Sequence, residues 1–308
     1  MTSASAPGKI ILFGEHAVVY GRPALAVPVT EVQATARVEE ASRPGVWVEA
    51  PDISLAADLA SLPADQPLAA AIRGVLTALA IASPPPLKVF ISSTIPVASG
   101  LGSGAAVSVA LIRALSAFLG QPLPDGRVSA LAYEVEKLHH GTPSGIDNTV
   151  IAHALPVYFV RGEPIEVLSV KVPFTIVIGD TGVAAPTREA VGDVRRLWET
   201  DKPRWEAVFD RIGEVARRAR QAIESGSVSD LGSLMAENQS LLEQLTVSSP
   251  ELERLISAGY RSGANGAKLS GGGRGGNMIA LVEKGNAPAV AEALRGAGAR
   301  RAIVTQVG

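Results

Sequence analysis

The sequence predicts an α+β protein of two domains, and three observations support that prediction. The chain has 308 residues, which is enough for two domains of ordinary size. Segments with strand-like and helix-like spacing of apolar residues follow one another without strict alternation, which favours α+β over a doubly wound parallel sheet. A strand-rich first half gives way to a helix-rich second half, and we expect the two domains to be residues 1–165 and 166–308.

In the first half, short runs of β-branched and apolar residues predict strands, and longer runs with apolar residues every three or four positions predict helices. Each helical run stops at residues that break helices: the prolines from Pro84, then Gly120, then Gly141. In chain order we expect strands at residues 9–14, 24–29, 33–41 and 46–50, a helix at 68–82, a strand at 87–94, and helices at 105–119 and 129–140.

In the second half, the same criteria predict a hairpin that turns at Gly162, followed by a buried strand and a long helical region. The helical region is broken near Pro203 and again at residues 225–229. In chain order we expect the hairpin at residues 154–172, a strand at 174–180, helices within 188–245, two strands around a glycine-rich loop within 266–283, a helix at 286–298 and a strand at 300–307.

The composition excludes several classes of function. The formal net charge is −2, so no broad attraction to nucleic acid or to an anionic membrane is expected. The chain has no cysteine, which excludes disulfides, thiolate metal sites and cysteine nucleophiles. The N-terminus lacks the basic region of a signal peptide, and no run of about 18 uncharged apolar residues is present. We therefore expect a cytoplasmic protein with no nucleic-acid or membrane partner.

The stretch PVASGLGSGAA, just before the helix expected from residue 105, indicates a phosphate-binding loop. Glycine occupies positions 100, 102 and 104. The first N–H groups of a helix lack helical partners and the helix dipole is positive there, so an anion fits against bare backbone. A tight turn without a ligand is the alternative interpretation.

Two common nucleotide-binding templates do not explain this loop. The spacing contains G-x-G-x-x-A, the dinucleotide fingerprint, but residues 95–99 separate it from the preceding strand. Asp125 has about the right distance for the acidic residue of that fingerprint, yet it lies in a turn. The P-loop pattern G-x-x-x-x-G-K-[ST] and the protein-kinase signatures are absent. The loop therefore predicts a phosphate cradle of another kind.

Four motifs, in order along the chain, resemble those of the GHMP kinases, the superfamily of galactokinase, homoserine kinase, mevalonate kinase and phosphomevalonate kinase. APGKIILFGEHAVVYG (residues 6–21) resembles the first motif, and IPVASGLGSGAA (95–106) the second, which wraps the nucleotide phosphates. EKLHHGTPSGIDN (136–148) resembles the segment around the catalytic aspartate, and GAKLSGGGRGGNMIAL (266–281) the third motif. The resemblance implies an N-terminal domain like that of ribosomal protein S5 domain 2, a ferredoxin-like C-terminal domain, and an active site between them.

The resemblance also implies phosphorylation of a small-molecule alcohol by ATP with Mg²⁺. The forms GEHAVVYG and HGTPSGIDN are most similar to the mevalonate kinase branch, which implies ATP and (R)-mevalonate as substrates and a monomer or homodimer. Another small-molecule kinase of the family, for phosphomevalonate or a sugar, is the alternative. A nucleotide-binding regulatory protein without catalysis is a third possibility, against which the presence of Lys9, Glu136 and Asp147 argues.

The matched motif positions imply roles for individual residues. Asp147 would orient the acceptor hydroxyl and take its proton, although the turn-rich TPSGID segment also suits a turn aspartate. Lys9 would stabilise the γ-phosphate or a developing alkoxide. Ser103 and Glu136 would ligate Mg²⁺, which prefers oxygen. The phosphates would lie against Pro96, Gly100, Leu101, Gly102, Ser103, Gly104 and Ala105.

The acceptor would face Glu15, His16 and Thr187, of which Thr187 can also cap the helix that follows it. Two positions depart from the family pattern. Gly104 replaces the second serine of the phosphate loop. Arg274 stands in the glycine run of the third motif, where it could meet a phosphate, a neighbouring carboxylate or solvent.

Overall fold

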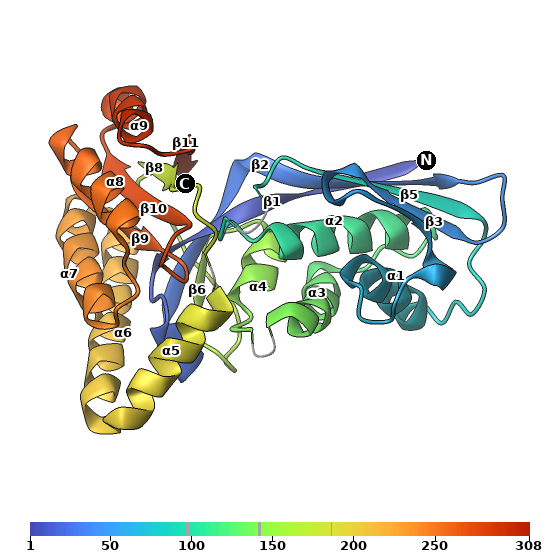
Figure 1. The fold of residues 1–308 in the computed structure, drawn as a ribbon, viewed down its shortest axis with the longest axis horizontal. Coiled ribbons are helices and arrows are strands. Elements are labelled where there is room, and N and C mark those ends of the chain that lie inside the picture. Colours follow the sequence, from blue (N-terminus) through green and yellow to red (C-terminus); the bar gives the residue numbers. More distant parts are fainter. Residues whose placement is uncertain (97–98, 141–142, 186) are drawn as a thin grey trace. The chain divides into compact units, whose positions relative to one another are not determined.

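The computed structural model describes residues 1–96, 99–140, 143–185 and 187–308, and the chain forms two compact units (Figure 1). Unit 1 comprises Met1–Gly8, Val32–Val97 and Gly102–Ala154, and unit 2 comprises Lys9–Glu31, Ala98–Leu101 and Leu155–Gly308. Five residues lie outside the described part of the chain: Val97 and Ala98 of the second motif, Gly141 and Thr142 of the segment 136–148, and Pro186. The side chains of His139 and His140 are also not described.

Unit 1 contains a mixed sheet arranged around β5 (Leu87–Ser93). β5 pairs antiparallel with the second half of β2 (Ala24–Glu40) and parallel with β3 (Val46–Ala50). β3 also pairs antiparallel with β4 (Leu55–Asp58). In this half of β2 buried residues alternate with more exposed ones, as expected for a strand with one face on the core. β1 (Thr2–Phe13) also pairs with β2, and both strands continue into unit 2.

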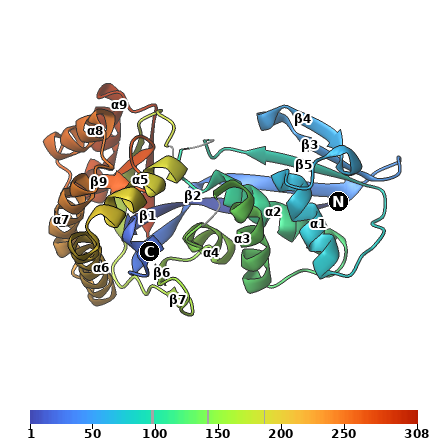
Figure 2. The same ribbon diagram turned by 60° about the horizontal axis from the view of Figure 1, so that its bottom comes forward.

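Helices α1 to α4 cover one face of this sheet (Figures 1 and 2). α2 packs on β5 and contacts α1, α3 and α4, while α3 contacts α1 and α4. Since a parallel strand pair needs a crossover, α1 also supplies the connection between β3 and β5. The bounds are α1 Pro67–Ala78, α2 Ser103–Phe118, α3 Asp125–His140 and α4 Ile146–His153.

Two sequence-based expectations for the first half of the chain need correction, and two elements were missed. The strands expected at 24–29 and 33–41 are one continuous strand, because the two adjacent exposed residues Thr30 and Glu31 interrupt the burial pattern but not the strand. The helix expected at 68–82 ends at Ala78, and Ala80 already has a left-handed backbone with φ of 54°. The short elements β4 and α4 were not predicted, since four and eight residues are too few to show a clear period.

Among its described residues, unit 2 holds a four-stranded antiparallel sheet in the order β11-β8-β10-β9. Counted along the chain this order is 4-1-3-2, with helices after the first and third strands, which is the ferredoxin-like arrangement expected for this half. The α+β fold class is therefore confirmed. The bounds are β8 Phe174–Asp180, β9 Gly266–Ser270, β10 Asn277–Val282 and β11 Arg301–Val307.

Helices α7, α8 and α9 pack on this sheet: α9 on β8 and β11, α8 on β9 and β10, and α7 on β9. The break expected near Pro203 separates α5 from α6, and the one expected at 225–229 separates α6 from α7. α8 was not predicted. The bounds are α5 Thr187–Thr200, α6 Lys202–Ser225, α7 Leu231–Gln244, α8 Pro250–Arg261 and α9 Ala287–Gly296.

The remaining elements are short. The predicted hairpin is present as β6 (Val157–Phe159) and β7 (Glu166–Val167), and β6 also pairs with the start of β2. Among the described residues no helix is both long and apolar enough to span a membrane. Short 3-10 helices are η1 Ala17–Tyr20, η2 Pro51–Ile53, η3 Leu59–Ser61, η4 Val228–Asp230 and η5 Lys284–Asn286.

α7 and β9 approach each other backbone to backbone at two glycines. A Cβ added at Gly232 would lie 2.2 Å from the carbonyl oxygen of Asn265, and one added at Gly266 would lie 2.6 Å from the Cα of Gly232. Only glycine fits at both positions. This contact holds α7 against β9 and determines which polar side chains of the two elements meet.

Candidate active site

The glycine-rich second motif opens α2, as expected. Gly102 precedes the helix with φ of 74°, Ser103 is its first residue, and Gly100 also has a positive φ of 85°. No side chain in the described part of the chain caps this end of α2. The first helical bond runs from the N–H of Ala106 to the carbonyl of Gly102 over 2.9 Å. The N–H groups of the first turn therefore keep the capacity to bind an anion.

Unit 2 holds the beginning of this loop in place. The N–H of Lys9 donates to the carbonyl of Leu101 over 2.9 Å, and the side-chain amide of Asn277 donates to the carbonyl of Ser99 over 2.6 Å. Lys9, Leu101 and Ser99 are all buried. The first and third motifs thus anchor residues 99–101 of the second motif within one unit, although the three motifs are far apart in the sequence.

Ser103, Glu136 and Asp147 belong to unit 1 and lie on α2, α3 and α4, which pack against one another. Glu136 is buried, whereas Glu134 is exposed and pairs with Lys137, so the two glutamates occupy different sides of α3. A carboxylate and a hydroxyl are donors that Mg²⁺ accepts, and this ion keeps several other ligands from water and phosphate. The oxygen donors of Ser103 and Glu136 therefore fit a magnesium site.

Asp147 lies at the second position of α4, not in an irregular turn as the sequence suggested. Gly145 precedes the helix with φ of 94°, and Asp147 is half-buried. The side-chain amide of Asn148 donates to the carbonyl and the hydroxyl of Ser129 on α3, over 3.2 Å and 2.9 Å. α4 is thus fixed to α3, and Asp147 lies in its first turn.

His16 follows the end of β1 in an unusual backbone conformation, with φ of 60° and ψ of −49°. Its Nε2 lies 3.1 Å from the carbonyl oxygen of Gly272 in the third motif. A carbonyl can only accept, so Nε2 carries the hydrogen and Nδ1 is the ring atom left with a lone pair. Burial, together with the charge of Arg274, lowers the pKa of His16 to about 4, so the imidazole is neutral at pH 7.

Glu15 is fully buried and pairs with a buried lysine that the sequence analysis did not single out. Lys268 on β9 bonds to Oε1 of Glu15, and the side-chain amide of Asn238 on α7 donates to Oε2 over 3.0 Å. The signal was present, because a lysine within the apolar strand GAKLS must be either exposed or paired. Its partner could not be read from the sequence.

Arg274 contacts a neighbouring carboxylate. This was one of the three surroundings, a phosphate, a carboxylate or solvent, that the sequence left open for its side chain. Its guanidinium forms an ion pair with Asp193 on α5, and its backbone N–H donates to the carbonyl of Val247 over 2.7 Å. Thr187, the first residue of α5, lies against the same loop, since a Cβ added at Gly272 would be 3.1 Å from its hydroxyl. The third motif is therefore packed against the start of α5.

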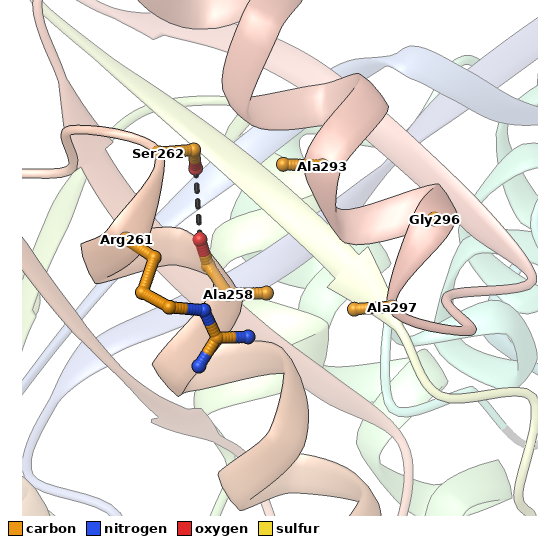
Figure 3. A pocket seen from close by; sticks show the side chains of 6 residues that line it. All are labelled: Ala258, Arg261, Ser262, Ala293, Gly296 and Ala297. Atoms are coloured by element: carbon orange, nitrogen blue, oxygen red, sulfur yellow. Dashed lines mark hydrogen bonds between the residues drawn. The ribbon is translucent and has the colours of Figure 1, made fainter.

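Two surface depressions are lined by none of these residues. One, of about 330 Å³, lies between α8 and α9 and is lined largely by small residues beside Arg261 (Figure 3). There the hydroxyl of Ser262 donates to the carbonyl of Ala258 over 2.9 Å. A second, beside Trp47 and Arg43 in unit 1, also contains no residue of the four motifs. The described residues contain no cluster of three histidine, aspartate or glutamate side chains arranged for a metal.

Comparison with known proteins assigns the family. Residues 68–154 match the GHMP kinases N terminal domain and residues 219–300 match the GHMP kinases C terminal domain. A mevalonate kinase from Pyrococcus horikoshii is 37% identical over 96% of this chain and 92% of its own length. The structure of L. major mevalonate kinase in complex with R-mevalonate has a TM-score of 0.85 at 29% identity, covering 100% of this chain and 96% of that one.

A Streptococcus pneumoniae phosphomevalonate kinase has a TM-score of 0.86 over 100% of both chains, but at 18% identity it shows a shared fold alone. The overall likeness in shape therefore does not distinguish between acceptors. The matched domains, the sequence identity over nearly the whole chain and the two-unit α+β fold agree with one another. The chain belongs to the GHMP kinase family.

Proposed function

We propose that this chain is a mevalonate kinase, which transfers the γ-phosphoryl group of ATP to the 5-hydroxyl of (R)-mevalonate. The observation that supports this most strongly is the 37% identity to a mevalonate kinase over 96% of the chain. The residues whose types the chemistry requires are present at the matching motif positions: Lys9 on β1, Ser103, Glu136, Asp147 and Thr187 on helices, and Glu15 and His16 in the turn after β1. The product, 5-phosphomevalonate, belongs to isoprenoid synthesis.

Unit 1 supplies the groups that act on the triphosphate and on the acceptor hydroxyl. The phosphates bind the open N-terminus of α2, where glycines leave the backbone accessible. Ser103 and Glu136 would hold Mg²⁺, which would neutralise charge on the phosphates when bound. Asp147 accepts the proton of the 5-hydroxyl as its oxygen attacks the γ-phosphorus and the bond to the ADP oxygen breaks.

Unit 2 supplies Lys9 and the residues that we assign to the acceptor. Lys9 stabilises negative charge on the γ-phosphoryl group. Phosphoryl transfer depends mainly on such electrostatic stabilisation and on positioning, and the protein forms no covalent intermediate. His16 and Thr187 bind mevalonate, and both lie against the third-motif loop through Gly272. Glu15 contributes through its buried carboxylate, whose two oxygens are bound by Lys268 and Asn238.

The proposal is tested by measuring ADP release with a panel of alcohols: mevalonate, phosphomevalonate, galactose and homoserine. We expect turnover with mevalonate and at most trace turnover with the others. A preference for phosphomevalonate or a sugar would leave the family assignment unchanged and would identify a different acceptor. Release of ADP with none of the four, by protein that still binds ATP, would favour a regulatory nucleotide-binding role.

A further inference from the structure

Lys268 is a buried charged group for which the proposed chemistry has no direct use. Its side chain is 0% exposed and every residue of β9 is buried. Burial lowers the pKa of this lysine and the carboxylate of Glu15 opposes that effect. Its ammonium group also donates to the carbonyl of Leu269 and lies 6.0 Å from the centre of the Phe13 ring. Such a group is tolerated in a core only when its partners are held in a definite geometry.

The partners of Lys268 are held in that way. Glu15 is 0% exposed, and its second oxygen accepts from Asn238 on α7. The next residue on α7, Gln239, accepts the N–H of Leu269 over 2.9 Å, so α7 binds both the carboxylate and the strand that carries the lysine. The glycine contact between α7 and β9 sets the spacing of this network. Glu15 therefore has one position in the folded protein.

His16 comes directly after Glu15, so the fixed position of Glu15 also restricts where the backbone of His16 can lie. A residue with a Cβ adopts a φ of 60° with a ψ of −49°, as His16 does, only when its surroundings hold it there. Two successive residues are held by one segment: Glu15 by Lys268 on β9, and the His16 ring by the carbonyl of Gly272 in the loop that follows. The two anchors act together on the position and rotation of the imidazole.

We propose that Lys268 is a positioning residue of the acceptor site, which fixes Glu15 and through it holds His16 as the Nε2–H tautomer with Nδ1 directed to accept from a substrate hydroxyl. This inference rests on the proposed function, in which His16 faces mevalonate. A neutral imidazole that accepts at Nδ1 recognises a hydroxyl and forms no ion pair with a carboxylate. Glu15 thus acts through the protein and not by touching the substrate.

The first experiment compares Lys268→Met with the wild type in steady-state kinetics. We expect the KM for mevalonate to rise about tenfold, because the imidazole loses its fixed orientation, while the KM for ATP changes less than about twofold. Lys88→Met is the matched control: it removes a lysine from an ion pair with Glu49 in unit 1, 2.8 Å long and partly exposed, and should leave both constants unchanged. An unchanged KM for mevalonate in Lys268→Met would overturn the inference.

The second experiment reads the His16 ring directly by nitrogen NMR, with His16→Asn to assign its signals. The wild type should show a single Nε2–H tautomer that stays neutral down to about pH 4, the pKa that burial and Arg274 impose. In Lys268→Met we expect a mixture of tautomers and titration nearer the ordinary value of about 6.5. A single unchanged tautomer would count against a positioning role, whatever the stability of the variant.

Lys268→Met leaves a buried carboxylate unpaired and could fail to fold, so a double variant completes the test. Glu15→Leu/Lys268→Met replaces both charges by apolar groups, which buried pairs often tolerate. We expect it to fold, with a mixed His16 tautomer and a raised KM for mevalonate, because apolar contact is not directional. Wild-type values in this variant would overturn the inference. If the wild type itself does not use mevalonate, the proposed function fails, and the tautomer measurement alone decides the role of Lys268.

Discussion

Two glycine-rich loops of this protein share a spacing and differ in what surrounds them. Glycines 100 and 102 of the second motif, with Ala105, match G-x-G-x-x-A, and glycines 271, 273 and 276 of the third motif match G-x-G-x-x-G. A Cβ added at Gly104 would meet nothing within 4 Å. One added at Gly273 would lie 2.0 Å from the carbonyl oxygen of Val247. The same residue type thus leaves backbone open in one loop and permits close packing in the other.

The difference teaches that glycine spacing alone does not identify a ligand site. The second-motif loop leads into a helix whose first turn has no side-chain cap among the described residues, which suits an anion. The third-motif loop leads into β10, and its surroundings bind it through Arg274, Gly272 and Asn277. We therefore expect changes near the open helix starts to alter activity, and changes in the packed loop to alter stability first.

The largest effect on activity should come from Asp147→Asn. α4, like α2, begins after a left-handed glycine without a side-chain cap, and Asp147 lies in its first turn. Loss of a general base lowers kcat by about 10²- to 10⁴-fold, while the melting temperature should change little. Asp125→Asn is the control, since Asp125 occupies the first turn of α3 and pairs with Arg113 at the surface. A wild-type rate in Asp147→Asn would show that the acceptor site is misassigned.

The largest effect on stability should come from Gly273→Ala. Its φ of 73° and the contact with Val247 combine strain with a clash, so the free energy of unfolding should fall by roughly 3 kcal/mol or more. Gly104→Ala, in the open first turn of α2, should instead raise it by about 0.5–1 kcal/mol, because alanine restricts the unfolded chain. Urea titrations of both variants measure the difference. Equal effects would remove the distinction between the two loops.

The contact between His16 and the packed loop predicts a dependence of stability on pH. Because the pKa of His16 is lowered to about 4 by burial first and by Arg274, the unfolded chain binds a proton below about pH 6.5 that the folded chain does not. The free energy of unfolding therefore has its full value above pH 6.5 and falls by up to about 3 kcal/mol as the pH drops toward 4. In His16→Asn, whose side chain does not titrate in this range, this part of the slope should vanish. Parallel curves for variant and wild type would contradict the assignment.

A smaller effect on activity is expected for Ser103→Ala at the open loop. Loss of one ligand or hydrogen bond of about 1.4 kcal/mol corresponds to a tenfold rise in the KM for Mg-ATP. The KM for mevalonate should not change, because Ser103 serves the phosphates. A magnesium titration at fixed ATP measures the effect, and an unaltered magnesium dependence would exclude Ser103 as a ligand.

The smallest effect is expected for Arg274→Gly, which restores the family residue in the packed loop. The variant loses a partly exposed ion pair with Asp193, worth about 0–1 kcal/mol, and relieves a left-handed arginine with φ of 58°, worth about 1 kcal/mol. The free energy of unfolding should therefore change by less than about 1 kcal/mol. A loss well above this in a thermal melt would show that the pair with Asp193 holds the third motif on α5.

Local patterns in the sequence were sufficient for the order of most elements. Apolar periodicity and helix breakers located α2, α3, α9 and the strands of the ferredoxin-like sheet, because burial on one face leaves a period that a single segment displays. The same reasoning failed for α4, whose eight residues are nearly all buried on α2 and α3 and so show no polar face. It also divided β2, since Thr30 and Glu31 are exposed within a continuous strand.

The sequence by itself determined the α+β class, which follows from local spacing, and the residue types available for phosphoryl transfer, which the resemblance of the motifs to those of the GHMP kinases identified. Only the tertiary structure decided that Glu15 pairs with Lys268, 253 positions away, and that Arg274 meets Asp193. The physical reason is that a buried charge requires a partner but does not specify which one. That choice depends on which strands and helices the packed core places side by side.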